Sequence, residues 1–319
     1  MTDRLPPARV LRHLVVTSRP LSWINTAYPF GAAWLLAGGG LDATFWVGCF
    51  FFLVPYNLAM YGINDVFDFE SDLRNPRKGG LEGDVLDRRV HRTVLWAAAL
   101  TCVPFVVWLL VAGGPQAITA VIPVLGLSLF AVVAYSVRGL RFKEIPLLDS
   151  LTSSTHFSSP AWVALAVLST WPSPAGWCGL AAFFLWGVAS QAFGAVQDVG
   201  PDREAGLGSI ATVLGARATV WVSLAGYVAA GVLALGAGPV LQWAALGAVP
   251  YIVSVARFVT VTDQTSADAH RGWTTFLWLN YLVGFGVTML LLVHAGALPV
   301  PGVPSAAGLL SAAGLTLAT

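Results

Sequence analysis

Oxygen-bearing side chains recur at intervals of four residues at two places in this 319-residue chain. The first is YGINDVFDFESD, which follows an apolar stretch and carries Asn64, Asp68 and Asp72. The second is VQDVGPDREAGLGS, which carries Asp198 and Asp202. Residues four apart lie on one face of an α-helix. Each group therefore predicts a row of amide and carboxylate oxygens at the end of a helix.

Rows of carboxylates repel one another unless cations lie between them. Mg²⁺ is typically held by one or two carboxylates together with the phosphate oxygens of a substrate, and it neutralises a leaving group as charge develops on it. Two such rows facing each other therefore favour a diphosphate bridged by Mg²⁺. The alternative is that these acids are solvated loop charges that balance nearby arginines. The repeated spacing at two helix ends favours the metal site.

Long apolar segments must position these rows. The chain is 56% hydrophobic and 10% charged, whereas soluble domains carry about 25% charged residues. Runs of about 20 apolar residues are long enough to span a bilayer. Nine such segments are predicted, at 20–38, 43–63, 92–112, 116–136, 147–169, 175–197, 213–235, 239–259 and 273–295. The predicted fold is all-α, a polytopic membrane protein.

The charges predict which loops share a side. All 17 basic residues fall in segments on one side or at the flanking helix ends, and Asp42 alone of the 16 acids lies opposite. Because Lys and Arg are enriched in cytoplasmic loops, we place the N-terminus in the cytoplasm and the C-terminus outside. Four crossings separate the two Asp-rich groups, so both are expected at the cytoplasmic face. The predicted organisation is a cytoplasmic segment 1–19, a nine-helix domain 20–295 and a non-cytoplasmic tail 296–319.

Three segments carry a family resemblance. The motif Asn64-Asp65-x-x-Asp68-x-x-x-Asp72 resembles the first Asp-rich motif of the UbiA-type intramembrane prenyltransferase superfamily. DVGPDREAGLGSIATVLG resembles its second motif, and AYSVRGLRFKEIP resembles its Tyr-Ser and basic segment. The second motif departs from the pattern at Gln197, where many members carry an acid.

The resemblance implies a fold and a site. The fold would be nine helices around a central apolar cavity, and the cofactor would be Mg²⁺. The implied metal ligands, of which the four acids are also catalytic, are Asn64, Asp68, Asp72, Asp198 and Asp202. The implied diphosphate contacts are Lys78, Arg138, Arg141 and Lys143, and Arg77 is expected to join them because it stands beside the acids. Asn57 and Tyr61 complete the expected substrate-binding set, with Asn64 in both roles.

A narrower resemblance concerns the acceptor. NLAMYGINDVFDFESDLRNPRKGGLEG and RFKEIPLLDSLTSSTHFSSPAW look like segments of bacterial and archaeal lycopene elongases. This implies an enzyme of the plasma membrane that transfers a C5 unit from dimethylallyl diphosphate to the end of lycopene, yielding C45 and C50 carotenoids. The alkene attack would leave a tertiary cation, which loses a proton or takes up water. Membrane lipid is an expected partner, and nucleic acid is not.

The polar segment LLDSLTSSTHFSSPAW bears on that last step. Intramembrane ionisable residues usually face a bundle interior or a cavity, so His156 is expected to accept the final proton or to position a water. Tyr61 and Tyr135 are expected to shield a cation with their ring faces, although tyrosines also serve as interfacial anchors. The hydroxyls of this segment equally suit bonds to neighbouring helix backbones and close packing.

Two other functions remain open. An aromatic-acceptor enzyme of the same superfamily, making a quinone or chlorophyll precursor, would share every metal residue. No arginine is expected inside a span to anchor a carboxylate, which favours a hydrocarbon acceptor. A transporter would place polar groups near the bilayer midplane, whereas here the charges gather at one face. The loop 69–91 suits either a lid over the diphosphate or a solvated basic loop.

Overall fold

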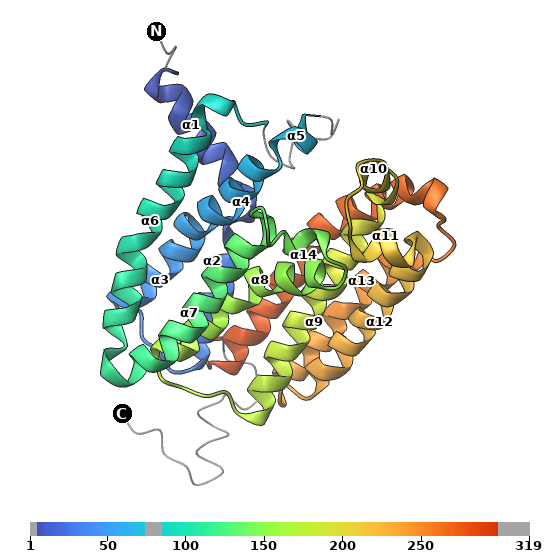
Figure 1. The fold of residues 1–319 in the computed structure, drawn as a ribbon. Coiled ribbons are helices and arrows are strands. Elements are labelled where there is room, and N and C mark those ends of the chain that lie inside the picture. The colour runs from blue at the N-terminus through green and yellow to red at the C-terminus, as the bar shows by residue number, and fades with distance from the viewer. Residues whose placement is uncertain (1–4, 74–84, 299–319) are drawn as a thin grey trace. The chain divides into compact units, whose positions relative to one another are not determined.

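The computed structural model describes residues 5–73 and 85–298 (Figure 1). Those residues form helices and loops, and none of them is in a strand. The chain divides into two compact units, Met1–Trp171 and Pro172–Thr319. The all-helical part of the prediction is confirmed.

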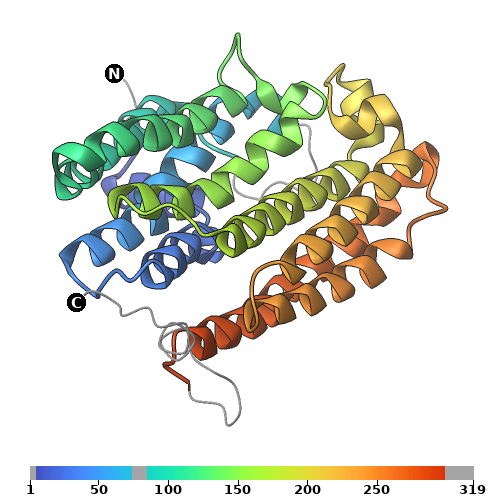
Figure 2. The same ribbon diagram turned by 90° about the horizontal axis from the view of Figure 1, so that it is seen from below.

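The first unit contains eight α-helices among its described residues. They are α1 (Pro7–Thr17), α2 (Trp23–Leu36), α3 (Ala43–Leu53), α4 (Pro55–Phe67), α5 (Phe69–Asp72), α6 (His91–Ala112), α7 (Gly114–Ser136) and α8 (Leu148–Val167). α8 packs along both α2 and α7, and α4 packs along α6 (Figure 2). The core between them is aromatic, with Phe30, Phe51, Phe52 and Tyr56 inaccessible to solvent.

A proline interrupts the segment expected to be one helix over 43–63. Pro55 has no N–H to bond the carbonyl of Phe51, so α3 ends and α4 starts at this point. The freed carbonyls find other donors. The Nδ2 of Asn57 donates to the carbonyl oxygens of Phe52 (2.8 Å) and Leu53 (3.0 Å), and the Thr26 hydroxyl also donates to Phe52 (2.7 Å). The break is therefore satisfied by buried side chains from α2 and α4.

The second unit contains six α-helices among its described residues. They are α9 (Pro174–Val196), α10 (Val199–Glu204), α11 (Ile210–Leu214), α12 (Ala216–Leu235), α13 (Ala248–Ala256) and α14 (His270–His294). α9 packs along α12, and a cluster of aromatic rings lies between α9, α12, α13 and α14. Tyr227 stacks on Tyr251 with a centroid separation of 5.3 Å, and Trp273 stacks on Phe276 at 4.8 Å.

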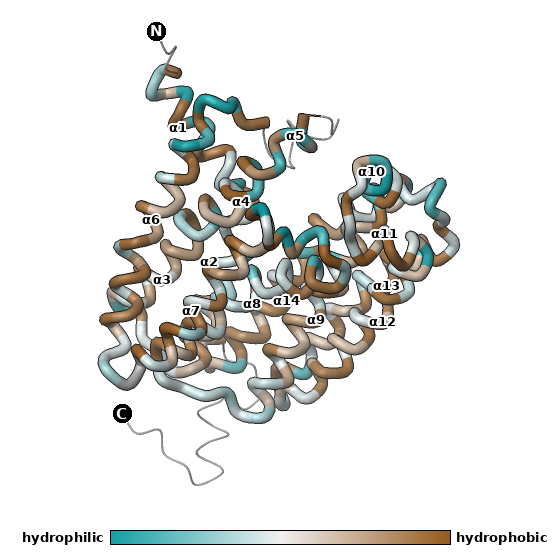
Figure 3. The backbone as a smooth tube through the Cα atoms, viewed as in Figure 1, coloured by the Kyte–Doolittle hydropathy of each residue, from teal (hydrophilic) through white to brown (hydrophobic). Residues whose placement is uncertain are grey.

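Six helical segments among the described residues are long and apolar enough to cross a membrane. They are Ala43–Phe67, Arg88–Ala112, Ile118–Ser136, Pro174–Val196, Ala216–Leu235 and Asp263–His294. The outer face of α6 is apolar, since Leu100, Val103, Val107 and Val111 are all more than half exposed, as suits contact with lipid. Hydrophilic residues concentrate at helix ends, around α1 and the start of α6 in one unit and around α10 in the other (Figure 3).

Three of the nine segments predicted to span the membrane are not both long and apolar enough to do so, although each is largely helical. α2 has 14 residues and contains Pro29. α8 has 20 residues but carries the run of serines and threonines. The segment Leu241–Ala256 is shorter than a span and begins as a 3₁₀-helix.

Candidate active site

The first Asp-rich motif keeps helical register across the end of α4. The Asp68 N–H donates to the Asn64 carbonyl (2.9 Å), and the Asp72 N–H donates to the Asp68 carbonyl (2.8 Å). The backbone thus continues from i to i+4 through α5, and the three side chains share one helix face as predicted. Asp68 is 9% exposed and Asp72 is 7% exposed, so both carboxylates are buried, whereas Asn64 is half-buried.

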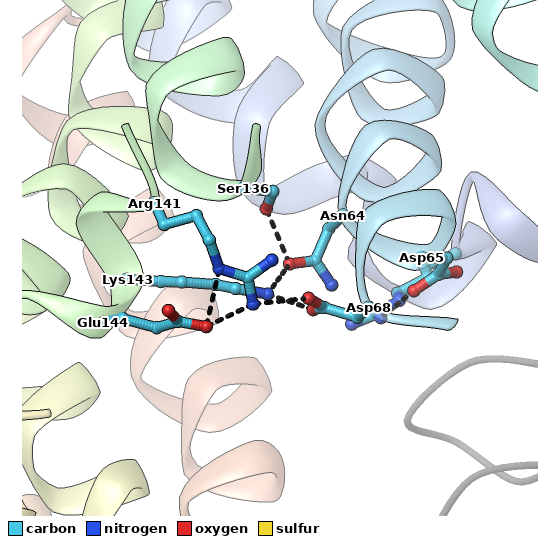
Figure 4. Close-up of polar contacts among 8 residues, drawn as sticks. Asn64, Asp65, Asp68, Ser136, Arg141, Lys143 and Glu144 are labelled. Atoms are coloured by element: carbon cyan, nitrogen blue, oxygen red, sulfur yellow. Dashed lines mark hydrogen bonds and ion pairs between the residues drawn. The ribbon is translucent and has the colours of Figure 1, made fainter. Parts of the chain in front are cut away.

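Two cations from the loop after α7 lie against this row (Figure 4). The Lys143 ammonium forms an ion pair with one Asp68 oxygen, and Arg141 Nη2 lies 3.5 Å from the other. Lys143 Nζ also donates to Asn64 Oδ1 (3.2 Å), and the Ser136 hydroxyl donates to the same oxygen (2.8 Å). Asn64 and Asp68 are therefore held by the end of α7 and by the loop that follows it.

The backbone of that loop turns the basic residues inward. Arg141 adopts a left-handed conformation (φ 43°) before the 3₁₀ turn Phe142–Glu144, a conformation that costs a non-glycine residue about 1–2 kcal/mol. Arg141 Nε donates to Glu144 (2.6 Å), and this bond raises the pKa of the guanidinium. Burial lowers the pKa of Lys143, while the Asp68 carboxylate opposes that shift. An additional anion beside Lys143 would favour its charged form.

A second ion pair is formed by Asp65 of α4, three residues before Asp68. Arg19 Nη2 lies 3.0 Å from Asp65 Oδ1, and the Asp65 side chain is fully buried. The Arg19 guanidinium also lies over the Tyr61 ring, 4.2 Å from its centroid. Asp65 thus faces the segment before α2, and the Tyr61 ring contacts this arginine.

Replacing Arg19 by Met is expected to lower the free energy of unfolding of the chain in detergent by about 3 kcal/mol, because breaking a buried ion pair leaves a poorly compensated charge. Denaturant titration of the purified protein measures this. Arg271→Met is the matched control, since Arg271 and Asp268 form an exposed pair with 83% and 56% of their side chains accessible. Equal stability of the two variants would contradict a structural role for the Arg19–Asp65 pair.

The other predicted site residues of the first unit fall in different places. Arg138 is exposed. The Nδ2 of Asn57 bonds Thr26 Oγ1 (2.6 Å) in addition to the two carbonyls of the helix break, so its amide nitrogen serves the fold. Tyr135 packs edge-to-face against His156 on α8, at 5.2 Å between ring centroids. Arg77 and Lys78 lie outside the described residues.

The second Asp-rich motif also keeps its register. The Asp202 N–H donates to the Asp198 carbonyl (2.9 Å) where α9 gives way to α10. Gln197 is bound on both sides of its amide, since Nε2 donates to the Gly194 carbonyl (3.1 Å) and Oε1 accepts from His270 Nδ1 (2.7 Å). The residue that departs from the family pattern therefore joins α9 to the start of α14.

Arg203 stabilises the glycine-rich run that follows this motif. Arg203 donates to the Thr212 carbonyl (2.8 Å) and pairs with Asp263 (2.5 Å), and Asp263 accepts the N–H of Ala216 at the start of α12 (2.7 Å). Gly215 has φ 80° at the junction of α11 and α12, a conformation that favours glycine. These contacts fix the turn that follows Asp202.

The donor chemistry fits Mg²⁺ bound with a phosphate ligand. Within the described part of the chain, no group of three His, Cys, Asp or Glu side chains is arranged to hold a metal ion alone. Mg²⁺ sites of nucleotide and prenyl substrates do not need such a cage, because phosphate oxygens and water complete the coordination. Asn64, Asp68 and Asp72 supply hard oxygen donors, and the adjacent Lys143 and Arg141 supply charge for the anion.

Three residues that make contacts in this site were not predicted from the sequence, namely Arg19, Ser136 and Glu144. Arg19 appears in the sequence only as a basic residue before Pro20. Ser136 stood inside the Tyr-Ser segment without an assigned partner, and Glu144 stood three residues after Arg141. Only the spacing of Arg141 and Glu144, which suits a local pair, offered a signal.

Comparisons with known proteins agree with these features. Residues 26–280 match the sequence profile described as the UbiA prenyltransferase family. A Corynebacterium glutamicum protein named lycopene elongase/hydratase is 52% identical over 282 residues, which cover 88% of this chain and 97% of that protein. A Dietzia protein named C(50) beta-cyclic carotenoids biosynthesis protein LbtBC is 56% identical over 287 residues, covering 89% of this chain and 65% of that protein. A Haloferax volcanii lycopene elongase/hydratase is 34% identical, covering 88% of each chain.

Solved structures show the same fold. A UbiA homolog from Archaeoglobus fulgidus, bound to DMAPP and Mg²⁺, has a TM-score of 0.56 at 15% identity and covers 86% of this chain and 99% of its own. A UbiA homolog from Aeropyrum pernix K1 has a TM-score of 0.55 at 19% identity, with coverage of 89% and 98%. At these identities the likeness concerns the arrangement of helices.

Proposed function

The chain belongs to the UbiA prenyltransferase family, and we propose that it transfers C5 units from dimethylallyl diphosphate to the ends of lycopene. The assignment of lycopene as the acceptor rests on the 52% identity to a lycopene elongase/hydratase over 97% of that protein. The buried row of oxygen donors beside Lys143 and Arg141 supports the reaction type, since departure of a diphosphate requires neutralisation of its charge.

The proposal assigns both Asp-rich motifs to one bound diphosphate. Asn64, Asp68 and Asp72 would hold Mg²⁺ from the first motif, and Asp198 and Asp202 from the second. Bound Mg²⁺ would neutralise the diphosphate oxygens as the bond to the prenyl group breaks. The sequence supports the convergence, because four predicted crossings return the chain to the same side of the membrane.

The basic residues bind and orient the anion. Lys143 and Arg141 face Asp68 in the structure, so both would lie beside a diphosphate bound at this carboxylate. Arg138, Arg77 and Lys78 complete the proposed set of diphosphate contacts. Charged hydrogen bonds to phosphate are roughly twice as strong as neutral ones, so these residues would hold the leaving group at the mouth of the site.

The membrane arrangement is part of the proposal. We assign nine spans, adding α2, α8 and the Leu241–Ala256 segment to the six apolar helices. The cytoplasmic side carries the N-terminus and both Asp-rich motifs, in accord with the distribution of Lys and Arg. Such an arrangement leaves the donor headgroup at the interface and its hydrocarbon part, with lycopene, in the apolar interior. Excluding water there protects the allylic cation from capture as an alcohol.

Vesicles test this proposal directly. Purified protein in vesicles that contain lycopene is expected to elongate it when dimethylallyl diphosphate and Mg²⁺ are added. A chelator is expected to stop turnover, and Mg²⁺ in excess to restore it; Ca²⁺ is expected to restore less, because it takes a larger and looser oxygen shell. Replacing lycopene by 4-hydroxybenzoate is expected to give no prenylated product. Prenylation of the aromatic acid, or turnover in the chelator, would contradict the proposal.

A further inference from the structure

The imidazole of His156 is buried, and among the described residues only one of its two ring nitrogens has a hydrogen-bond partner. The side chain is 3% exposed at the centre of α8. It forms a hydrogen bond with the backbone of Ala131 on α7. Among the described residues, no hydrogen-bond partner reaches Nε2, which is itself inaccessible to solvent. The Ala131 carbonyl must therefore be bound through Nδ1–H.

This arrangement fixes the chemistry of the ring. A neutral imidazole that donates through Nδ1 carries a lone pair on Nε2. Burying an acceptor without a partner costs about 1–3 kcal/mol. The buried Ser128 hydroxyl of the same unit, by contrast, forms hydrogen bonds with both Tyr56 (3.1 Å) and Ser159 (2.7 Å). His156 Nε2 is therefore the lone-pair nitrogen of a neutral imidazole, held in the buried part of α8.

Two consecutive residues of α7 lie between His156 and the Asp-rich row. Tyr135 packs against the imidazole, and the next residue, Ser136, donates to Asn64. Asn64 in turn shares Lys143 with Asp68. Consecutive residues of α7 therefore link the diphosphate end of the site to a base placed deeper on α8.

We propose that His156 Nε2 accepts the proton released when the cation on the elongated acceptor is quenched. This inference rests on the proposed function. The terminal double bond of the acceptor forms a C–C bond to the allylic cation and leaves a tertiary cation. A neighbouring C–H bond then breaks, its electron pair forms a new C=C bond, and the proton goes to Nε2.

Hydration uses the same base. Water oxygen forms a C–O bond to the tertiary cation, and one of its protons goes to Nε2. In both cases the resulting imidazolium returns the proton to solvent when the product leaves. The mass of the product distinguishes the two sources of the proton, because only hydration adds the elements of water.

The His156→Asn variant removes the basic nitrogen but keeps the hydrogen bond to the Ala131 carbonyl. The Asn amide can still donate to the Ala131 carbonyl, because its nitrogen occupies the position of Nδ1, but it offers no base in place of Nε2. We expect the rate of elongated carotenoid formation to fall about 100-fold or more. Donor consumption should fall less, so the ratio of dimethylallyl alcohol to elongated carotenoid should rise. His156→Ala should recover elongation when imidazole is added.

Ser158→Ala is the matched control. Its hydroxyl is buried on the same helix and donates to the Ser154 carbonyl (2.9 Å), so the variant is expected to keep the wild-type rate and product ratio. Wild-type rate and ratio in His156→Asn, or a proportional loss of alcohol and carotenoid without imidazole rescue, would overturn the role of His156. Absence of elongated carotenoid from the wild-type chain would instead overturn the proposed function.

Discussion

Asp68→Asn is expected to lower the rate of lycopene elongation by about 1,000-fold while the protein stays folded in the membrane. The substitution keeps the shape of the side chain but removes the charge that would hold Mg²⁺. It also leaves Lys143 and Arg141 without the carboxylate they face. Removing one group that stabilises a developing charge typically lowers the rate 100- to 1,000-fold, which corresponds to roughly 3–4 kcal/mol in the activation free energy.

Glu70→Gln is the control for this experiment. Glu70 lies in the same motif, and this substitution makes the same change from acid to amide. The Glu70 side chain, however, is 60% exposed and pairs with Arg88 at the surface. Exposed ion pairs contribute about 0–1 kcal/mol, so this variant should keep nearly wild-type activity. Rates are measured by chromatography of carotenoids from vesicles of equal protein content. Equal activity of Asp68→Asn and Glu70→Gln would contradict the assignment of the metal site.

Asp198→Asn is expected to lower the rate by a similar factor, although Asp198 belongs to the other unit of the chain. If both carboxylates act on one bound diphosphate, removing either one disables the same step. The Asp68→Asn/Asp198→Asn double variant should then lose little more than each single variant, because residues that act as a unit are not additive.

The control for the second motif is Asp268→Asn. Asp268 is 56% exposed and pairs with Arg271 at the surface, so its loss should leave turnover within about twofold. A wild-type rate in Asp198→Asn would remove the second motif from the proposed site. A double variant whose loss equals the product of the two single losses would contradict a shared diphosphate.

Local periodicity was enough to predict the two rows of oxygen donors. The four-residue spacing of Asn64, Asp68 and Asp72 predicts a common face whenever the backbone stays helical, and the bonds from Asp68 and Asp72 to the preceding turn confirm that it does. The same holds for Asp198 and Asp202. These relations lie within one turn of helix and need no tertiary information.

The partners of the rows depend on tertiary structure. Lys143 reaches Asp68 across 75 positions of sequence, by way of a left-handed residue at Arg141 that side-chain patterns do not predict. The pair of Arg19 and Asp65 joins residues 46 positions apart. No periodic signal encodes such contacts, because they depend on how α1, α4 and α7 pack.

Segment lengths were less predictable than segment positions. Hydropathy favoured one helix over 43–63, but the missing N–H of Pro55 divides it, and Asn57 is used to satisfy the break. Asn57 therefore shows how a polar residue near a motif can serve the fold. In α8 the hydroxyls offset the apolar residues, so hydropathy alone does not identify it as a span.

The carotenoids of a lycopene-producing bacterium that expresses this chain provide the most direct test. Chromatography with mass spectrometry should find new carotenoids heavier than lycopene by one and by two C5 units, with or without added water. The same host with Asp68→Asn, present in the membrane at equal amount, should retain lycopene. Unchanged lycopene beside wild-type protein in the membrane would contradict the account.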